Sequence, residues 1–155
     1  MRDSISSTQQ AFAKRQQHLR ANRNPKRRGE LAELAFIHKA TSLGFAVART
    51  YGDSQHYDFI VHSAPRFWRV QVKSSNALQD GAYMVNAIHS VNGRYTGYTA
   101  DEIDFLVAHI VPEDTWFVIP VQAFTPHQSL YVRPRGKSRR RGPYEKYREA
   151  WHLMA

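Results

Sequence analysis

One stretch of the sequence, YDFIVHSAPRFWRVQVK, constrains the fold more than any other. It holds two short apolar runs, Phe59–Val61 and Phe67–Val72, separated by the turn-prone residues 62–66. β-Branched and aromatic residues on both sides of a turn predict a β-hairpin. We therefore expect the two runs to be adjacent antiparallel strands, which limits the side chains that can meet.

The polar residues of this hairpin predict a site at its open end. Strand alternation places Arg69, Gln71 and Lys73 on one face and the apolar residues between them on the other. If the turn is centred on the Ala64–Pro65 bond, Asp58 falls opposite Gln71, within a residue or two. A carboxylate, an amide and an ammonium group would then converge.

The rest of the chain predicts an α/β (α+β) fold, with a mixed sheet of about five or six strands flanked by helices. Residues 29–43 give the clearest helix, ended by Gly44, with an apolar stripe at three- and four-residue steps. That stripe comprises Leu31, Leu34, Ala35, Ile37 and His38. Further strands are expected over 45–49, 82–88, 103–111 and 116–121, the last two joined by a turn at 112–115. Residues 90–97 are expected to be a loop, and a last helix is expected to open at Pro143.

Charge divides the chain into three parts. Residues 1–28 carry a net charge of +7, residues 29–132 carry −4 and residues 133–155 carry +6, which sum to the net +9 of the whole chain. We expect a basic, flexible arm over 1–28, with a helix at 11–20 on contact with phosphates, and a core domain over 29–124. Residues 125–155 are expected to form a basic Pro/Arg-rich segment and a C-terminal helix. Basic flanks around an acidic core suit a protein that binds nucleic acid at its flanks and a cation at its centre.

Several residues are candidates for nucleic-acid contacts. They are the run Lys26, Arg27 and Arg28 beside the core, Ser74 after the second hairpin strand, and the run Arg139, Arg140 and Arg141, which is a candidate phosphate clamp. The alternative is that the basic runs are solvated flanks that aid solubility.

Composition excludes other classes of site. The chain has no cysteine, so neither disulfides nor thiolate metal sites are possible. No apolar run is long enough for a membrane span and no signal-peptide core is present, so we expect a cytoplasmic, nucleoid-associated protein. The histidines show no zinc-binding spacing and are interpreted as surface or core residues. The exceptions are His56 and His62, which flank the first hairpin strand and could contact DNA.

The polar residues at the open end of the hairpin suit phosphodiester hydrolysis. Mg²⁺ prefers oxygen ligands, and Asp58, the amide of Gln71 and the carbonyl of Val72 offer them. Lys73 could orient or deprotonate a water, or stabilise charge on the phosphorus centre. Glu33 could reach in from the helix, although Glu30 and Glu33 also suit the first turn of a helix electrostatically. The alternative for Asp58 and Lys73 is a simple cross-strand ion pair.

Across residues 26–124 the chain resembles the PD-(D/E)XK nuclease superfamily, in particular the small endonucleases that include intron-encoded homing endonucleases. The matching segments are GELAE (29–33), YGD (51–53), YDFIV (57–61), RVQVK (69–73), YTADEIDF (98–105) and FVIPV (117–121).

The resemblance implies a fold, an activity and residue roles. It implies a restriction-endonuclease-like core and Mg²⁺-dependent cleavage, with Mn²⁺ as a possible substitute, that leaves 5′-phosphate ends. By it Asp58, Gln71, the Val72 carbonyl and Glu33 hold the metal, and Lys73 is the catalytic lysine.

The sequence departs from the superfamily pattern at two positions. Tyr57 replaces the usual Pro, and Gln71 replaces the usual acid, which removes a negative charge and lowers the expected affinity for metal. Three functions remain open: a DNA endonuclease, an inactive DNA-binding module of the same fold, and a nuclease for branched DNA or RNA. Because cutting both strands usually needs two sites, a homodimer or homotetramer is expected.

Overall fold

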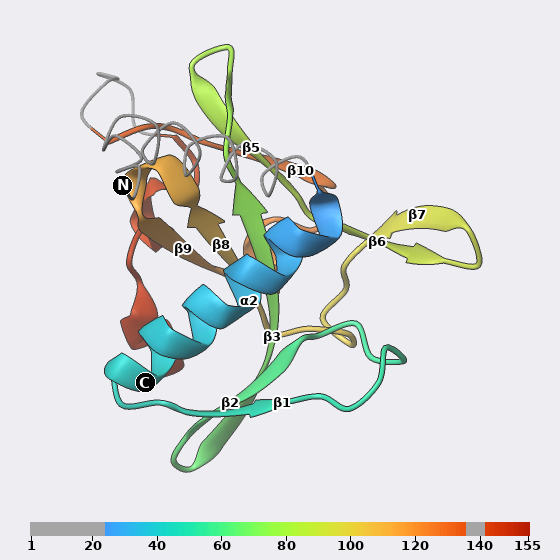
Figure 1. The fold of residues 1–155 in the computed structure, drawn as a ribbon, viewed down its shortest axis with the longest axis vertical. Helices are drawn as coiled ribbons and strands as arrows, with labels where there is room; N and C mark the ends of the chain where they lie inside the picture. Colours follow the sequence, from blue (N-terminus) through green and yellow to red (C-terminus); the bar gives the residue numbers. More distant parts are fainter. Residues whose placement is uncertain (1–23, 136–141) are drawn as a thin grey trace, which may run out of the picture.

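The structure, a computed structural model, describes residues 24–135 and 142–155. Its centre is a mixed sheet with the strand order β1-β2-β3-β8-β9 (Figure 1). β3 and β8 are parallel, and the other neighbouring strands are antiparallel. The strands span Ala46–Arg49 (β1), Phe59–Ser63 (β2), Arg66–Ser75 (β3), Phe105–Ile110 (β8) and Thr115–Pro120 (β9). The predicted fold class, α and β with a mixed sheet, is confirmed.

The predicted hairpin is confirmed as β2 and β3. Phe59 pairs with Val70 and Ser63 with Arg66, and the same register continued by one residue sets Asp58 opposite Gln71. The prediction that β3 ends before Ser74 is wrong. β3 continues to Ser75 because β8 pairs with it in parallel over its whole second half and satisfies its backbone groups there.

The predicted helix is α2, Pro25–Ser42, and it begins earlier than expected. Pro25 occupies the first turn, where its missing N–H costs nothing, and the Asn24 side chain caps the helix by accepting the Arg27 N–H at 3.2 Å. The basic run 26–28 is therefore helical and not part of a flexible arm. Glu30 and Glu33 lie beyond the first turn, so helix-dipole stabilisation does not explain them.

The N-cap gives a first testable expectation. Asn24→Ala should lower the free energy of unfolding by about 1 kcal/mol, because the Arg27 N–H loses its acceptor, whereas Asn24→Gly should cost only a few tenths. Urea denaturation of both variants at equal m-value measures the difference. Because both substitutions remove the acceptor, equal losses would show that the lost hydrogen bond, and not backbone conformation, sets the cost. No loss in either variant would show that the cap contributes nothing to stability.

The buried stripe of α2 differs from the predicted one. It consists of Ala32, Phe36 and Ala40, whereas Leu34 is 61% exposed. Phe36 stacks on Phe59 at a centroid separation of 5.0 Å and also contacts two tryptophan rings. The small alanines on either side allow the helix to approach the sheet closely, and this packing decided the rotation of the helix.

The other face of the sheet is covered by a small second sheet in the order β10-β5-β4. Its strands are Ser129–Val132 (β10), Ala82–Asn86 (β5) and Leu78–Gln79 (β4). β10 lies in the segment from 125 onward, where no strand was predicted. The short 3₁₀ helix Val121–Ala123 follows β9, and another, Val111–Glu113, joins β8 to β9 as the predicted turn.

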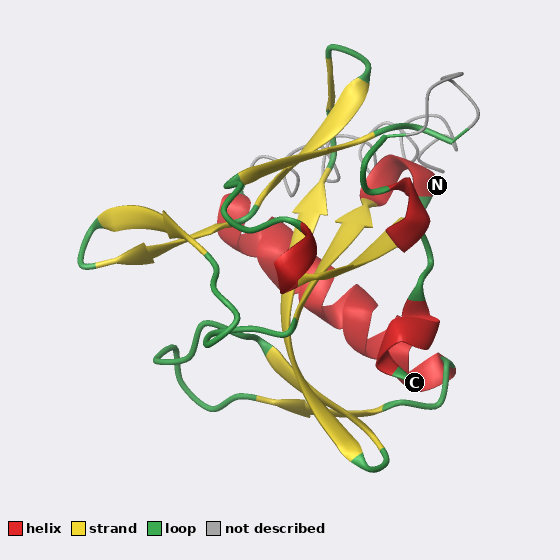
Figure 2. Cartoon of the chain, turned by 180° about the vertical axis from the view of Figure 1, so that it is seen from behind, coloured by secondary structure: helices red, strands yellow, loops and turns green. Residues whose placement is uncertain are grey.

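The predicted loop at 90–97 is instead a β-hairpin. Its strands are Ile88–Val91 (β6) and Arg94–Gly97 (β7), and it projects from the body of the molecule (Figures 1 and 2). Asn92 and Gly93 both have positive φ, 50° and 76°, as tight hairpin turns require. The Asn-Gly pair predicted a turn correctly, and the pairing of its flanks was missed.

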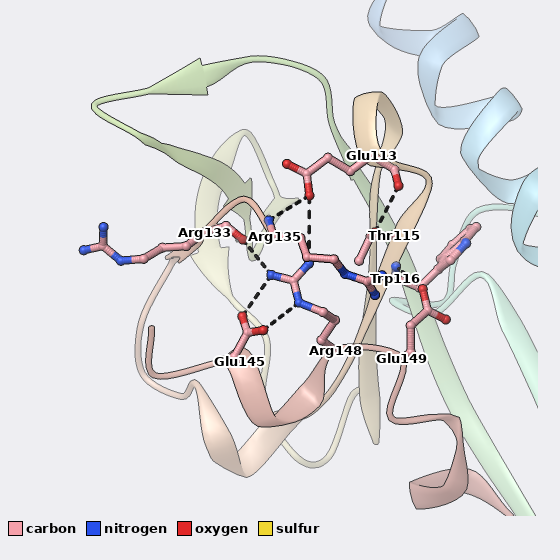
Figure 3. Close-up of polar contacts among 8 residues, drawn as sticks. All are labelled: Glu113, Thr115, Trp116, Arg133, Arg135, Glu145, Arg148 and Glu149. Carbon is pink, nitrogen blue, oxygen red and sulfur yellow. Dashed lines mark hydrogen bonds and ion pairs between the residues drawn. The ribbon is translucent and has the colours of Figure 1, made fainter. Parts of the chain in front are cut away.

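The C-terminal segment forms no α-helix within the described residues 142–155, so the predicted C-terminal helix is wrong. It holds two 3₁₀ helices, Glu145–Tyr147 and Trp151–Met154. Figure 3 shows how the segment is fixed: Arg148 donates to Glu145 at 2.8 Å and to the Arg133 carbonyl at 2.7 Å, and Glu149 accepts the Trp116 N–H at 2.8 Å. The Arg148 contacts hold the segment against the chain after β10, and the Glu149 contact holds it against β9. These contacts favour short turns over a regular helix.

Large side chains of this segment pack into the core. Tyr144, Trp151 and Met154 are buried. The predicted helix at 11–20 lies outside the described residues. No helix of the described residues is long and apolar enough to cross a membrane.

Candidate active site

The site forms where β3 continues past the first residue of β2, Phe59, which pairs with Val70. The Asp58 N–H donates to the Val70 carbonyl at 2.9 Å, so Val70 directs its backbone groups toward β2. Residues two apart on a strand direct their backbone groups to the same side, so those of Val72 face the space that β2 leaves open. There the Asp58 carboxylate accepts the Val72 N–H at 2.9 Å and takes the place of a neighbouring strand.

Gln71 is buried beside this carboxylate. Its amide nitrogen Nε2 donates to Asp58 Oδ2 at 2.8 Å and to the Val72 carbonyl at 3.2 Å. Two oxygens, one from the residue before β2 and one from β3, thus converge on one electropositive group. The convergence that the sequence predicted for Asp58 and Gln71 is present, and the Val72 carbonyl joins them.

Lys73 lies on the same face of β3 as Gln71. Its Nζ donates to the Ile88 carbonyl at 3.2 Å and lies 5.5 Å from the centre of the Tyr98 ring. Burial lowers the pKa of Lys73, and the nearby Asp58 carboxylate opposes that shift only in part. The predicted alternative, a direct ion pair between Lys73 and Asp58, is not among the ion pairs of the described residues.

Glu33 reaches the site from α2. It is half-buried and pairs with Arg49 at 2.8 Å. Burial raises the pKa of Glu33, and repulsion from Asp58 raises it further. Burial also raises the pKa of Asp58, although the Val72 hydrogen bond and the Lys73 charge oppose this. Two partly desolvated carboxylates face one space, which favours a cation there.

One cleft of about 480 Å³ brings most of the predicted residues together. The predicted residues that line it are Arg28, Glu33, Asp58, Gln71, Val72, Lys73 and Ser74. Lys26 and Arg27 are exposed in the same helical turn as Arg28 but do not line the cleft. Arg139, Arg140 and Arg141 lie outside the described residues.

Part of the cleft wall consists of residues that were not predicted from the sequence. Asn76, Gln79 and Asn86 line it from β4, β5 and the segment before them. The buried Asn76 Oδ1 has no hydrogen-bond partner among the described residues. In the sequence, the signal for Asn76 was its position as a polar residue closely after the candidate site residues Lys73 and Ser74. Arg69, by contrast, lies outside the cleft, because Asp104 binds its guanidinium at 2.8 and 3.1 Å.

The structure thus combines a mixed sheet, a carboxylate before one strand and the Gln71-x-Lys73 pair on the next, which is the arrangement that the sequence resemblance implied. The chain belongs to the PD-(D/E)XK endonuclease family, because a sequence model of that family matches residues 23–154. The predicted resemblance is confirmed, and the match runs beyond residue 124, where the predicted core ends.

Comparison with one solved structure agrees with this assignment. A bacterial homing endonuclease, I-Ssp6803I, superposes with a TM-score of 0.76 at 29% identity, over 84% of this chain and 93% of that one. MepB is more distant, with a TM-score of 0.40 at 10% identity, over 70% of this chain and 81% of that one. A search of curated proteins finds no match.

Proposed function

We propose that this nuclease is a Mg²⁺-dependent DNA endonuclease that hydrolyses phosphodiester bonds and leaves 5′-phosphate ends. The observation that carries the proposal is the convergence of Asp58, Gln71, Val72 and Lys73 in one cleft beside the basic end of α2. Mn²⁺ is a second candidate cation, since it accepts the same oxygen ligands.

The donor atoms present fit a hard divalent cation. Asp58 Oδ2 and the Val72 carbonyl already converge on one electropositive group, the Gln71 amide nitrogen. Rotation of that amide would present its oxygen as a third ligand, and Glu33 offers a second carboxylate. Mg²⁺ needs only one or two carboxylates, because it keeps several waters. When bound, the ion supplies Lewis-acid charge and an acidified water.

The residues of the chain supply the remaining functions. The Ile88 carbonyl and the Tyr98 ring position the Lys73 amine in the cleft. Because burial lowers its pKa, this amine gives up its proton more readily than an exposed lysine. We assign it the role of positioning and deprotonating the attacking water. Arg49 holds the Glu33 carboxylate at the cleft.

The first turn of α2 is proposed to contact the DNA backbone. Lys26, Arg27 and Arg28 place three cations at a helix N-terminus, where the dipole is already positive. This arrangement does not stabilise the helix, but it attracts phosphates. Changing all three to alanine should lower the slope of log K against log salt by ~0.9 per lost contact, about 2.7 in total.

Duplex binding is measured with EDTA present, so that the DNA stays intact. Arg28→Ala alone should remove about one contact, ~0.9 in slope. Lys146→Ala, an exposed charge in the C-terminal segment, is the matched control and should leave the slope unchanged. Equal slopes for the triple variant and the wild type would refute backbone contact by this turn.

The activity itself is tested on supercoiled, branched and single-stranded DNA and on RNA, with Mg²⁺, Mn²⁺ or EDTA. We expect metal-dependent nicking of supercoiled DNA. The neutral Gln71 favours one alternative, a DNA-binding module without catalysis, which duplex binding without cleavage under all conditions would establish. Preference for branched DNA or RNA would reassign the substrate. Sedimentation of the protein with DNA tests the proposed dimer or tetramer.

A further inference from the structure

A second cluster of ligand atoms lies at the base of the projecting β6–β7 hairpin. It consists of His56, His89 and Glu102, which come from the loop before β2, from β6 and from the turn before β8. Their ligand atoms all lie within 4.8 Å of one another. Glu102 Oε1 is 3.2 Å from His89 Nε2 and 3.5 Å from His56 Nε2. None of the three lines the candidate active site.

Glu102 is oriented by its other oxygen. Glu102 Oε2 accepts the Thr99 N–H at 2.8 Å and the Thr99 hydroxyl at 3.2 Å, which leaves Oε1 directed at the histidines. The cluster therefore presents one carboxylate oxygen and two imidazole nitrogens to the same space.

Hydrogen bonding does not explain the cluster. The His89 side chain is only 10% exposed, and neither of its ring nitrogens has a hydrogen-bond partner among the described residues, although Glu102 Oε1 is only 3.2 Å away. The approach is short enough for a hydrogen bond, but its direction is wrong. His89 Nε2 and Glu102 Oε1 lie close together, but neither atom is directed at the other. This geometry suits two ligands that are both directed at a third position, where a metal ion would lie.

We propose that His56, His89 and Glu102 bind a zinc ion or a similar transition-metal cation, separate from the Mg²⁺ of the active site. Zinc bonds of 2.0–2.1 Å in a tetrahedron place ligand atoms about 3.3 Å apart, between the two separations found here. Two imidazoles select zinc over Mg²⁺, which prefers oxygen ligands. The fourth ligand would be water.

The ion would join three segments that surround the active site. His56 is two residues before Asp58, and His89 follows Ile88, whose carbonyl holds Lys73. His89 also packs against the Tyr98 ring, which contacts the Lys73 amine, at a centroid separation of 4.8 Å. The role we assign is structural: the ion fixes the base of the hairpin and the loop that leads to Asp58.

The test uses untagged Asp58→Asn protein, in which the active-site carboxylate is removed. Titration with Zn²⁺ and with Co²⁺, followed by calorimetry and by the visible spectrum of Co²⁺, should show one site per chain with a tetrahedral cobalt spectrum. His56→Gln in the same background should weaken binding by more than about 100-fold, since even outer-shell partners of a metal contribute 10–100-fold. Zn²⁺ should also raise the melting temperature of the parent but not of the His56→Gln protein.

His56 is partly exposed, so its replacement is compatible with folding, and circular dichroism checks this. His127→Gln removes an exposed histidine elsewhere and should bind Zn²⁺ as the parent does. Absence of a stoichiometric site in the parent, or equal affinity in the His56→Gln protein, would overturn the proposal. Because the readouts are binding and melting, they are independent of whether the protein cuts DNA.

Discussion

Asp58→Asn is expected to lower the rate of Mg²⁺-dependent cleavage by at least ~10³-fold, because the ion contributes several kcal/mol and each 1.36 kcal/mol is tenfold. The fold should survive the change. Asp58 Oδ2 accepts both the Val72 and the Gln71 hydrogen bonds, and the amide oxygen of asparagine can accept the same two. Single-turnover cleavage of supercoiled DNA measures the loss.

The same substitution is expected to stabilise the metal-free protein. The pKa of Asp58 is raised in the fold, mainly by burial, so the folded state binds a proton more readily than the unfolded state. Its contribution to stability is therefore present below the ordinary aspartate pKa and is lost as pH rises through the raised value. Asp58→Asn should raise the melting temperature at neutral pH in EDTA, and the gain should vanish in acid.

Asp53→Asn is the matched control, since Asp53 is exposed on the same loop. It should change neither cleavage nor melting temperature. If Asp58→Asn cut DNA at the wild-type rate, the assignment of the metal site would be wrong. If it melted lower than the wild type at neutral pH, the carboxylate would be contributing to stability and not straining the fold.

Lys73→Met is expected to reduce cleavage by about 10²–10⁴-fold, the usual contribution of a group that transfers a proton. Duplex binding should change little, because Lys73 is a single partly buried charge in the cleft. Since burial lowers the pKa of Lys73, wild-type activity should rise with pH and level off below the ordinary titration range of lysine.

Lys73→Arg distinguishes the two roles of a cation at this position. Arginine keeps the charge but does not release its proton, so it should cleave as poorly as Lys73→Met if Lys73 transfers a proton. Substantial cleavage by the arginine variant would assign Lys73 to charge stabilisation instead. A pH profile that keeps its rise in Lys73→Met would show that another group titrates.

The sequence predicted the hairpin, the mixed sheet and the convergence of Asp58 with Gln71 because these follow from local rules. Strand alternation and turn position fix which residues face each other across a hairpin. The rotation of α2 was predicted wrongly, since that depends on how Phe36 fits between aromatic rings from β2, β9 and the C-terminal segment. Periodicity identifies an apolar helix but not the residues against which the helix packs.

Tertiary contacts explain the other differences. Sequence spacing could not show that His56, His89 and Glu102 lie together, because they come from three separate segments that the fold brings together. The C-terminal helix was expected to open at Pro143, because proline is favoured at the first position of a helix. The segment instead follows β9, where Phe117 bridges to Arg148 and Glu149 accepts the Trp116 N–H.

Residues 71–75 of β3 extend past the paired part of β2, and this arrangement limits where insertions and deletions can occur in the chain. One residue added within β3 between Arg66 and Val70 would exchange the faces of all later side chains, because the strand period is two. Gln71 and Lys73 would then point toward α2, and the free backbone groups would belong to a different residue. Residues added at the Ala64–Pro65 tip would leave the register intact. Length variants that keep activity should therefore be confined to the tip of this hairpin.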